Sequence, residues 1–161
     1  MKSNRVRVLE RVLTLGIAIG LVGAAPAQEP GAVCFLTVGK SQQSGNPERK
    51  NYVINDTAAW EDLWDKVNAG LSPKPALPEI DFTRRTIIAI FQGSQPTSGY
   101  EVTITNIVNA EGHIQVVVKE LMNPNCGGLG VITRPFHIVE VDKLDAAAIE
   151  FRVKQKVRKC S

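Results

Sequence analysis

The stretch "TIIAIFQ", residues 86–92, decides the fold class of this chain. It is apolar from Ile87 to Phe91, with no polar residue between them. A half-exposed strand alternates apolar and polar residues, whereas an unbroken apolar run suits a strand that is covered on both faces. The sequence therefore predicts a central β-strand over residues 86–92.

Six further segments have the composition and pattern of β-strands. In residues 100–109 the alternation puts Val102, Ile104 and Val108 on one side, and residues 113–122 follow after a turn that contains a glycine. The other predicted strands are residues 32–39, 51–55, 134–141 and 148–155.

Residues 55–70 change from the period of a strand to that of a helix. Their apolar residues recur at i, i+3, i+4 and i+7, which forms one stripe along a helix. Polar residues 55–57 offer N-cap oxygens, Gly70 is placed to end the helix, and the prolines of residues 71–82 predict an irregular surface segment. The stripe consists of Trp60, Leu63, Trp64 and Val67.

One helix beside about seven strands predicts a mainly β fold of the α+β kind. The two architectures that fit are an antiparallel β-sandwich and an open barrel, with the helix packed alongside. Residues 28–161 show no internal repeat and no linker, so they are expected to form a single domain.

Residues 1–27 have the pattern of a signal peptide. Four basic residues precede an apolar run from Val12 to Ala25, and Ala25-Pro26-Ala27 fits a signal-peptidase site. The run is short for a bilayer span, which disfavours the alternative of an uncleaved anchor. A lipid-anchor motif has a small residue immediately before its cysteine, whereas the branched Val33 precedes Cys34 here, which disfavours a lipid anchor. We therefore expect an exported protein, periplasmic or extracellular, without a stable membrane anchor.

Cleavage after residue 27 would leave a formally neutral chain. The whole sequence has 19 basic and 16 acidic residues. Residues 1–27 contain four of the basic residues and one of the acidic residues, so 15 of each kind remain. This balance gives no reason to expect nucleic acid as a partner. The C-terminal residues 151–161 are locally basic, and their alternating charges predict the solvated face of an edge strand.

Two loops contain more Gly, Pro and polar residues than a turn requires. The first is "GSQPTSGY", residues 93–100, and the second is "MNPNCGGLGVITRPF", residues 122–136. Either they are ordinary connections, or they are binding loops carried by a rigid scaffold. Tyr100 has the same two interpretations, a buried structural ring or a ring whose hydroxyl lies at an interface.

Catalytic groups are scarce in the same sequence. A nucleophile pair of Cys126 and His137 can be written, but no third residue is indicated that would orient it. Cys126 with His113 and His137 lacks the spacing of a metal site, and no phosphate-binding loop or dinucleotide fingerprint is present. We therefore expect a protein that is not an enzyme and that has no metal or cofactor.

The three cysteines allow one disulfide and three possible pairings. Cys34 opens the first predicted strand and Cys160 follows the last one, so the two would meet if those strands paired antiparallel. On this basis we favour a Cys34–Cys160 bridge, with Cys126 left over.

The chain resembles the C-terminal domain of the PrcB-like family, subunits of secreted bacterial protease complexes. The resemblance covers about residues 33–153 and rests on "DTAAWEDLW", "PEIDFTRRTIIAIFQG", "PTSGYEVTI" and "NPNCGGLGVITRPFHIVEV". It implies a small, β-rich, non-catalytic exported domain that associates with a protease or another protein.

A second resemblance concerns loop motifs only. "QPTSGY", "GGLG" and "RPF" are similar, in the same order, to the three loops of chagasin-type inhibitors of papain-like cysteine peptidases. It implies an inhibitor as the alternative function. In that family intervening strands separate the corresponding motifs, whereas three residues separate the last two motifs here.

A non-enzymatic, exported protein-binding domain is the function that the sequence favours. Its partner is a protein, a protease or another one, and its contact surface is expected on the two loops. The expected contact residues are Gln95, Pro96, Thr97, Ser98, Gly99, Tyr100, Asn125, Gly127, Gly128, Arg134, Pro135 and Phe136.

Overall fold

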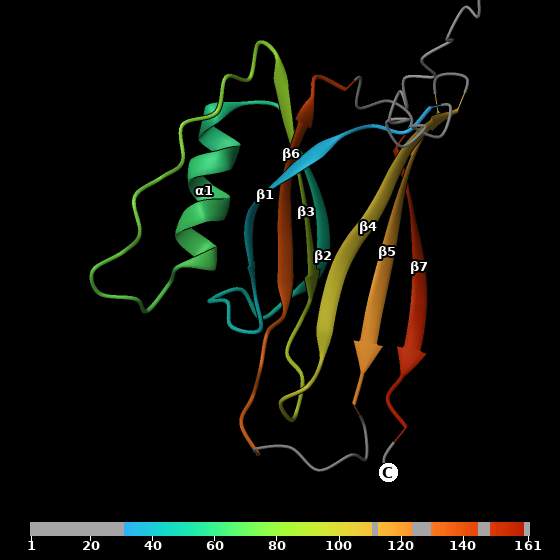
Figure 1. Ribbon diagram of the computed structural model, residues 1–161. Helices are drawn as coiled ribbons and strands as arrows, with labels where there is room; N and C mark the ends of the chain where they lie inside the picture. Colours follow the sequence, from blue (N-terminus) through green and yellow to red (C-terminus); the bar gives the residue numbers. More distant parts are fainter. Residues whose placement is uncertain (1–30, 111–112, 124–129, 145–148, 160–161) are drawn as a thin grey trace, which may run out of the picture.

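The computed structural model describes residues 31–110, 113–123, 130–144 and 149–159. These residues form three layers, a helix, a four-stranded sheet and a three-stranded sheet (Figure 1). Of the two predicted architectures the sandwich is therefore confirmed. In chain order the elements are β1 (Phe35–Ser41), β2 (Arg49–Ile54), α1 (Thr57–Val67), β3 (Arg85–Gln92), β4 (Glu101–Ala110), β5 (His113–Met122), β6 (Phe136–Asp142) and β7 (Ile149–Val157).

The strand β3 lies inside the four-stranded sheet, whose order is β1-β6-β3-β2. Ile87, Ala89 and Phe91 face the helix and belong to the core beneath it. Ile88 and Ile90 face the other way and pack into the core between the two sheets. The predicted central strand is thus confirmed, and its unbroken apolar run follows from having a packed layer on each side.

The second sheet has the order β4-β5-β7 and contains a pairing that the sequence did not reveal. β5 and β7 run parallel, with Val116 beside Phe151, whereas the other strand pairs are antiparallel. The chain leaves this sheet after β5, forms β6 in the first sheet and returns as β7, and such a crossover allows parallel neighbours. The fold is therefore mainly, and not wholly, antiparallel.

The helix is held at its start and along its outer side by specific hydrogen bonds. The side chain of Asp56 accepts from the backbone N–H of Ala59 at 2.9 Å, as an N-cap residue does. The indole N–H groups of Trp60 and Trp64 donate to the carbonyl oxygens of Pro78 and Pro75, at 2.9 and 3.2 Å. The irregular proline-rich segment therefore wraps over the helix, as its composition predicts.

The middle of β4 corrects one residue of the sequence prediction. A bulge between Ile104 and Asn106 shifts the register against β5. Alternation alone puts Val108 on the core side, but the extra residue turns Ile107 inward, where it is fully buried.

The first and last strands do not pair with each other. β1 pairs with β6 in one sheet, whereas β7 pairs with β5 in the other. The predicted pairing of the first and last strands, which would bring Cys34 and Cys160 together, is therefore wrong. Cys160 lies outside the described residues, so the bridge itself stays an untested prediction.

Candidate functional site

The two loops predicted for recognition lie side by side at the lower end of the sandwich in Figure 1. Gln95 and Thr133 exchange two backbone hydrogen bonds, of 2.7 and 3.0 Å, as neighbouring strands do. The hydroxyl of Thr133 also donates to the carbonyl oxygen of Thr97 at 3.0 Å. We call residues 93–99 and 130–135 the paired loops, since these bonds fix one against the other.

Gly99 shapes the first of these loops. Its φ of +91° belongs to the region that favours glycine. A Cβ atom there would also lie 2.6 Å from Nδ2 of Asn123. That amide, in turn, donates to the carbonyl oxygen of Ser98 at 2.8 Å, so Asn123 holds the loop from beneath. The sequence indicated the glycine but not Asn123, because nothing local to Asn123 shows which loop it will meet.

Arg134 ties a third segment to the paired loops. Its backbone N–H donates to the carbonyl oxygen of Gln42 at 2.9 Å. Its guanidinium group lies 3.3 Å from the hydroxyl of Ser94 and 3.4 Å from the carbonyl oxygen of Ser44. Arg134, a predicted contact residue, is therefore half-buried and also holds the loops together.

Three of the predicted contact residues are buried. Tyr100 is 5% exposed, and Pro135 and Phe136 are buried as well. The ring of Phe136 stacks on that of Phe91, with centroids 5.8 Å apart. These rings support the paired loops from the core, so Tyr100 fits the structural interpretation better than the interfacial one.

The outer side of the paired loops is formed by other residues. Ser94 and Pro96 are exposed, and Gln95, Thr97, Ser98 and Gly99 are half-buried. Val131 and Ile132 are 46% and 62% exposed, although both are large apolar residues. The sequence prediction missed these two. The signal that could have found them is a pair of branched apolar residues within a loop otherwise rich in glycine and polar residues.

A hollow of about 220 Å³ lies beside Arg134. Val67, at the end of α1, and Ala69 and the exposed Leu71, which follow the helix, form its other wall. The hollow adds concave, partly apolar surface next to the paired loops.

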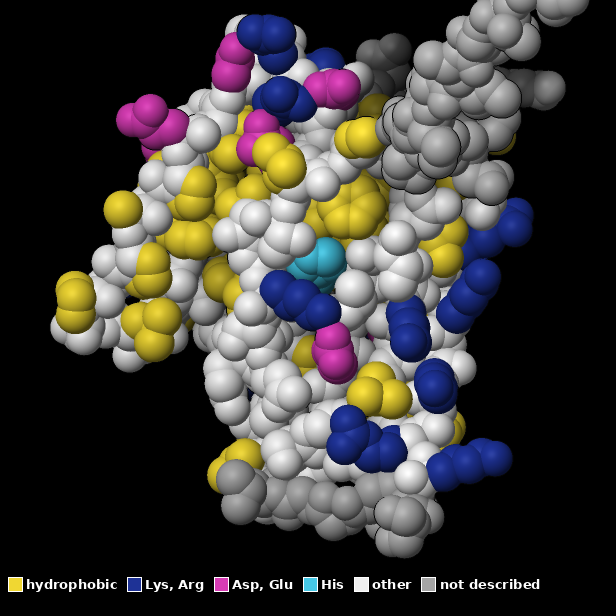
Figure 2. All heavy atoms as spheres, in the orientation of Figure 1, with side chains coloured by type: hydrophobic (Ala, Val, Ile, Leu, Met, Phe, Trp, Pro, Cys, Tyr) yellow, Lys and Arg dark blue, Asp and Glu magenta, His cyan; other side chains and the backbone are white. Residues whose placement is uncertain are grey.

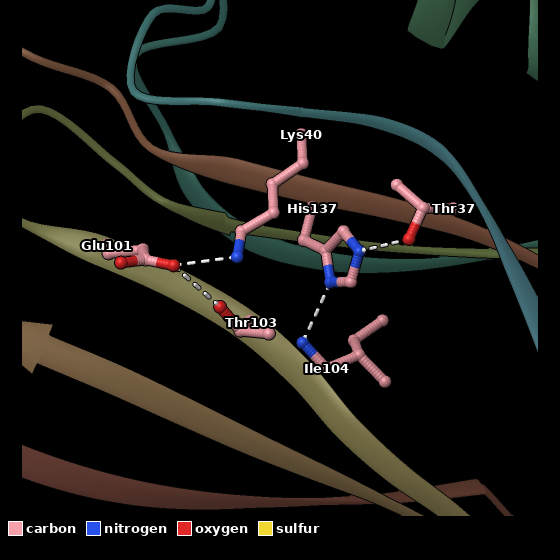
Figure 3. Close-up of polar contacts among 6 residues, drawn as sticks. All are labelled: Thr37, Lys40, Glu101, Thr103, Ile104 and His137. Carbon is pink, nitrogen blue, oxygen red and sulfur yellow. Dashed lines mark hydrogen bonds and ion pairs between the residues drawn. The ribbon is translucent and has the colours of Figure 1, made fainter.

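His137 lies in the core beside this region and joins the two sheets (Figure 3). Its Nδ1 accepts from the backbone N–H of Ile104 on β4 at 2.9 Å. Its Nε2 lies 3.0 Å from the hydroxyl of Thr37 on β1. Because Nδ1 accepts, the neutral ring carries its proton on Nε2 and donates it to Thr37.

The surroundings of His137 keep the ring neutral. Burial is the main cause that lowers its pKa to about 4, and the nearby ammonium group of Lys40 lowers it further. Glu101 acts in the opposite direction, but its carboxylate is bound by Lys40 at 2.7 Å. That bond in turn lowers the pKa of Glu101. Both ring nitrogens of His137 are hydrogen-bonded, so the geometry fits a structural residue that holds the two sheets together. It gives no support to the predicted nucleophile pair of Cys126 and His137.

Several predicted residues lie outside the described part of the chain. They are the contact residues Asn125, Gly127 and Gly128, together with Cys126 and the N-terminal segment 1–27. Within the described ranges, no three His, Cys, Asp or Glu side chains are grouped so that they could hold a metal ion. In the same ranges, no helix has the length and apolar character that a membrane crossing requires.

Comparison with known families matches residues 86–142 to the family described as PrcB C-terminal. The matched segment runs from β3 to the end of β6 and includes both paired loops. Over residues 86–142 the resemblance to the PrcB-like family is confirmed. No curated protein and no solved structure matches the chain. The PrcB-like match thus covers the segment from β3 to β6 and leaves β1, β2, α1 and β7 outside.

Proposed function

We propose that this chain is an exported, non-catalytic protein-binding domain that uses the paired loops to associate with a protease or another extracytoplasmic protein. One observation carries this proposal. Val131 and Ile132 are exposed on a loop whose backbone is fixed against a second loop. Exposed apolar residues on a rigid, polar-rimmed surface are typical of protein–protein contact sites.

The PrcB-like match supports a protease as the class of partner. The resemblance associates the family with secreted protease complexes, and the matched residues include the loops that we propose for contact. The hydrogen bonds that join the two loops support the same function, because a surface held in place before binding loses less conformational entropy on binding.

The chagasin-like alternative has one specific observation in its favour. The paired loops bring the first predicted motif, residues 95–100, beside the third, residues 134–136. Loops that together enter the active site of a peptidase must lie next to one another in this way. Burial of Pro135 and Phe136 counts against the third motif as a contact, so we place this alternative second.

Site-specific photocrosslinking in the organism that produces the chain tests the proposal. A photoreactive residue at position 132 is expected to capture a defined protein, and a protease among the captured proteins would support the predicted partner class. The matched control carries the same group at Leu36, which is also exposed but lies on β1 near the opposite end of the sheet. Equal capture from both positions would contradict the proposal.

The inhibitor alternative has a separate test. The chain is expected to block a papain-like peptidase at a stoichiometric ratio if the alternative holds, and Gly99→Arg is expected to abolish the block. Lack of inhibition at micromolar concentrations would eliminate it.

A further inference from the structure

The strand β7 forms one edge of the three-stranded sheet and has two chemically different faces. It is nine residues long and pairs on one side with β5. On its other side no strand is paired within the described residues. Every second residue of such an edge strand directs its backbone N–H and C=O outward, where a further strand could bind.

The outward face of β7 is basic. Arg152, Lys154 and Lys156 lie there with one acidic residue, Glu150, which pairs with Arg152. Lys154 is in register with Lys119 of β5. Among the described residues, no carboxylate lies within ion-pair distance of Lys119, Lys154 or Lys156. Figure 2 shows the resulting concentration of Lys and Arg side chains over this sheet. This face of the sheet therefore has a net positive charge.

A hollow of about 370 Å³ continues this basic face toward β4. Three lysines, Lys40, Lys119 and Lys156, line it together with the hydroxyl groups of Thr103 and Thr105. Ammonium groups are donors suited to carboxylates, whereas the hydroxyl groups of Thr103 and Thr105 already donate to Glu101 and to the carbonyl oxygen of Val117. The one acidic residue in this lining is Glu101, which Lys40 already neutralises.

The inward face of β7 is apolar except for Gln155, whose amide binds Glu120, and it is incompletely covered. Val153 and Val157 are 43% and 56% exposed. They lie on the same face of β7 as Ile149 and Phe151, which pack against the core between the sheets. Val153 lines a hollow of about 280 Å³ that opens toward Arg49–Asn51 of β2. Its other lining residues are the apolar Ile90, Phe91, Val102 and Val118 and the acidic Glu120, whose carboxylate is already bound by Arg49.

We propose that β7 docks an extended segment of a partner protein in which acidic residues alternate with apolar ones. The partner's backbone would bind the free edge, its carboxylates would meet Lys154 and Lys156, and its apolar side chains would cover Val153 and Val157. Charge complementarity selects this occupant over a second copy of the chain, because the lysines of two β7 strands would repel each other. This surface is separate from the paired loops, and its proposal does not rest on theirs.

Peptide binding to the purified full-length chain tests the inference. The probe is a peptide of about eight residues that alternates valine with glutamate, and its affinity is measured by fluorescence anisotropy. We expect binding that slows amide hydrogen exchange in β7. The charge reversal Lys154→Glu/Lys156→Glu is expected to weaken binding at least about tenfold and to favour a valine–lysine peptide instead. The control Lys66→Glu/Lys74→Glu makes the same change in net charge at the helix side and is expected to leave the affinity within about twofold.

Two altered peptides separate edge docking from simple charge attraction. A peptide of the same composition with its glutamates in one block, and the alternating peptide N-methylated at every second residue, are both expected to bind far more weakly. Equal binding of the blocked peptide would overturn the proposal. So would no binding at about 1 mM, or tight Lys154-dependent binding of DNA or of anionic vesicles without binding of the alternating peptide.

Discussion

At the scale of single residues, Gly99 is required for two separate reasons, its positive φ and the side chain of Asn123 beneath it. Gly70 has a similar φ of +87°, but a Cβ atom added there would have no residue other than its chain neighbours within 4 Å. A substitution of Gly70 therefore measures the energetic cost of the positive φ alone. We expect Gly70→Ala to lower the free energy of unfolding by about 1 kcal/mol, and Gly99→Ala to lower it by at least about 1 kcal/mol more. Urea denaturation measures both, and equal losses would contradict the role assigned to Asn123.

His137 predicts a specific dependence of stability on pH. Its pKa is about 4 in the folded chain and near the ordinary value of 6.5 when unfolded. Between these values the unfolded chain binds the proton and the folded chain does not, so stability falls as the pH is lowered from about 6.5 to about 4. The shift corresponds to about 3 kcal/mol.

The variant His137→Gln is expected to lose this part of the pH dependence, measured as the free energy of unfolding at pH 7.5 and at pH 4. His113→Gln is the control, because His113 is exposed at the start of β5. If the two variants showed the same pH dependence, His137 would not be the group responsible.

At the scale of elements, the start of α1 depends on the N-cap of Asp56. We expect Asp56→Ala to lower the free energy of unfolding by about 1 kcal/mol, because the N–H of Ala59 then loses its acceptor. Asp62→Ala removes an equal charge from an exposed position within the helix and is expected to have a smaller effect. Thermal unfolding followed by circular dichroism distinguishes them, and a loss for Asp62→Ala as large as that for Asp56→Ala would argue against the cap.

Elements with strong local signals were predictable from the sequence, and those that depend on distant contacts were not. The stripe from Trp60 to Val67 and the apolar run of β3 reflect burial at fixed periods, which any sequence window shows. The bulge in β4 leaves the local pattern ambiguous, since both Ile107 and Val108 are apolar. The partner of β7 could not be predicted, because alternation shows that a strand has two faces but not which strand lies beside it.

The candidate site divides in the same way. Glycine, proline and polar composition identified both paired loops, but their contact through Gln95 and Thr133 arises from the pairing of β3 with β6 and from the packing of the two sheets. The burial of Tyr100 and Phe136 and the exposure of Ile132 also follow from that packing. Composition therefore located the surface, and the fold determined which of its residues face outward.

At the scale of the whole molecule, an ion pair between the buried Glu120 and the exposed Arg49 links the two sheets on the side away from His137. Glu120 of β5 is almost fully buried and binds Arg49 of β2 at 2.5 Å and the amide of Gln155 at 3.2 Å. We expect Arg49→Met to destabilise the fold by roughly 1 to 3 kcal/mol, because it leaves a buried carboxylate without its counter-ion.

The double variant Arg49→Met/Glu120→Gln tests that explanation. It is expected to recover part of the lost stability, since a neutral amide costs less to bury than an unpaired carboxylate. Chemical denaturation of the two single variants and the double variant gives the coupling energy. Strictly additive losses would show that the pair does not join the sheets energetically.

The central claim is that the paired loops form the contact surface of a protein-binding domain, and the affinity of the captured partner tests it most directly. The measurement compares the chain, the variant Val131→Ser/Ile132→Ser and the control Leu36→Ser by isothermal titration calorimetry. The loop variant is expected to bind at least about tenfold more weakly, because two apolar side chains are lost from the interface. The control is expected to bind as the unaltered chain does. Unchanged affinity in the loop variant, with its fold intact, would contradict the claim.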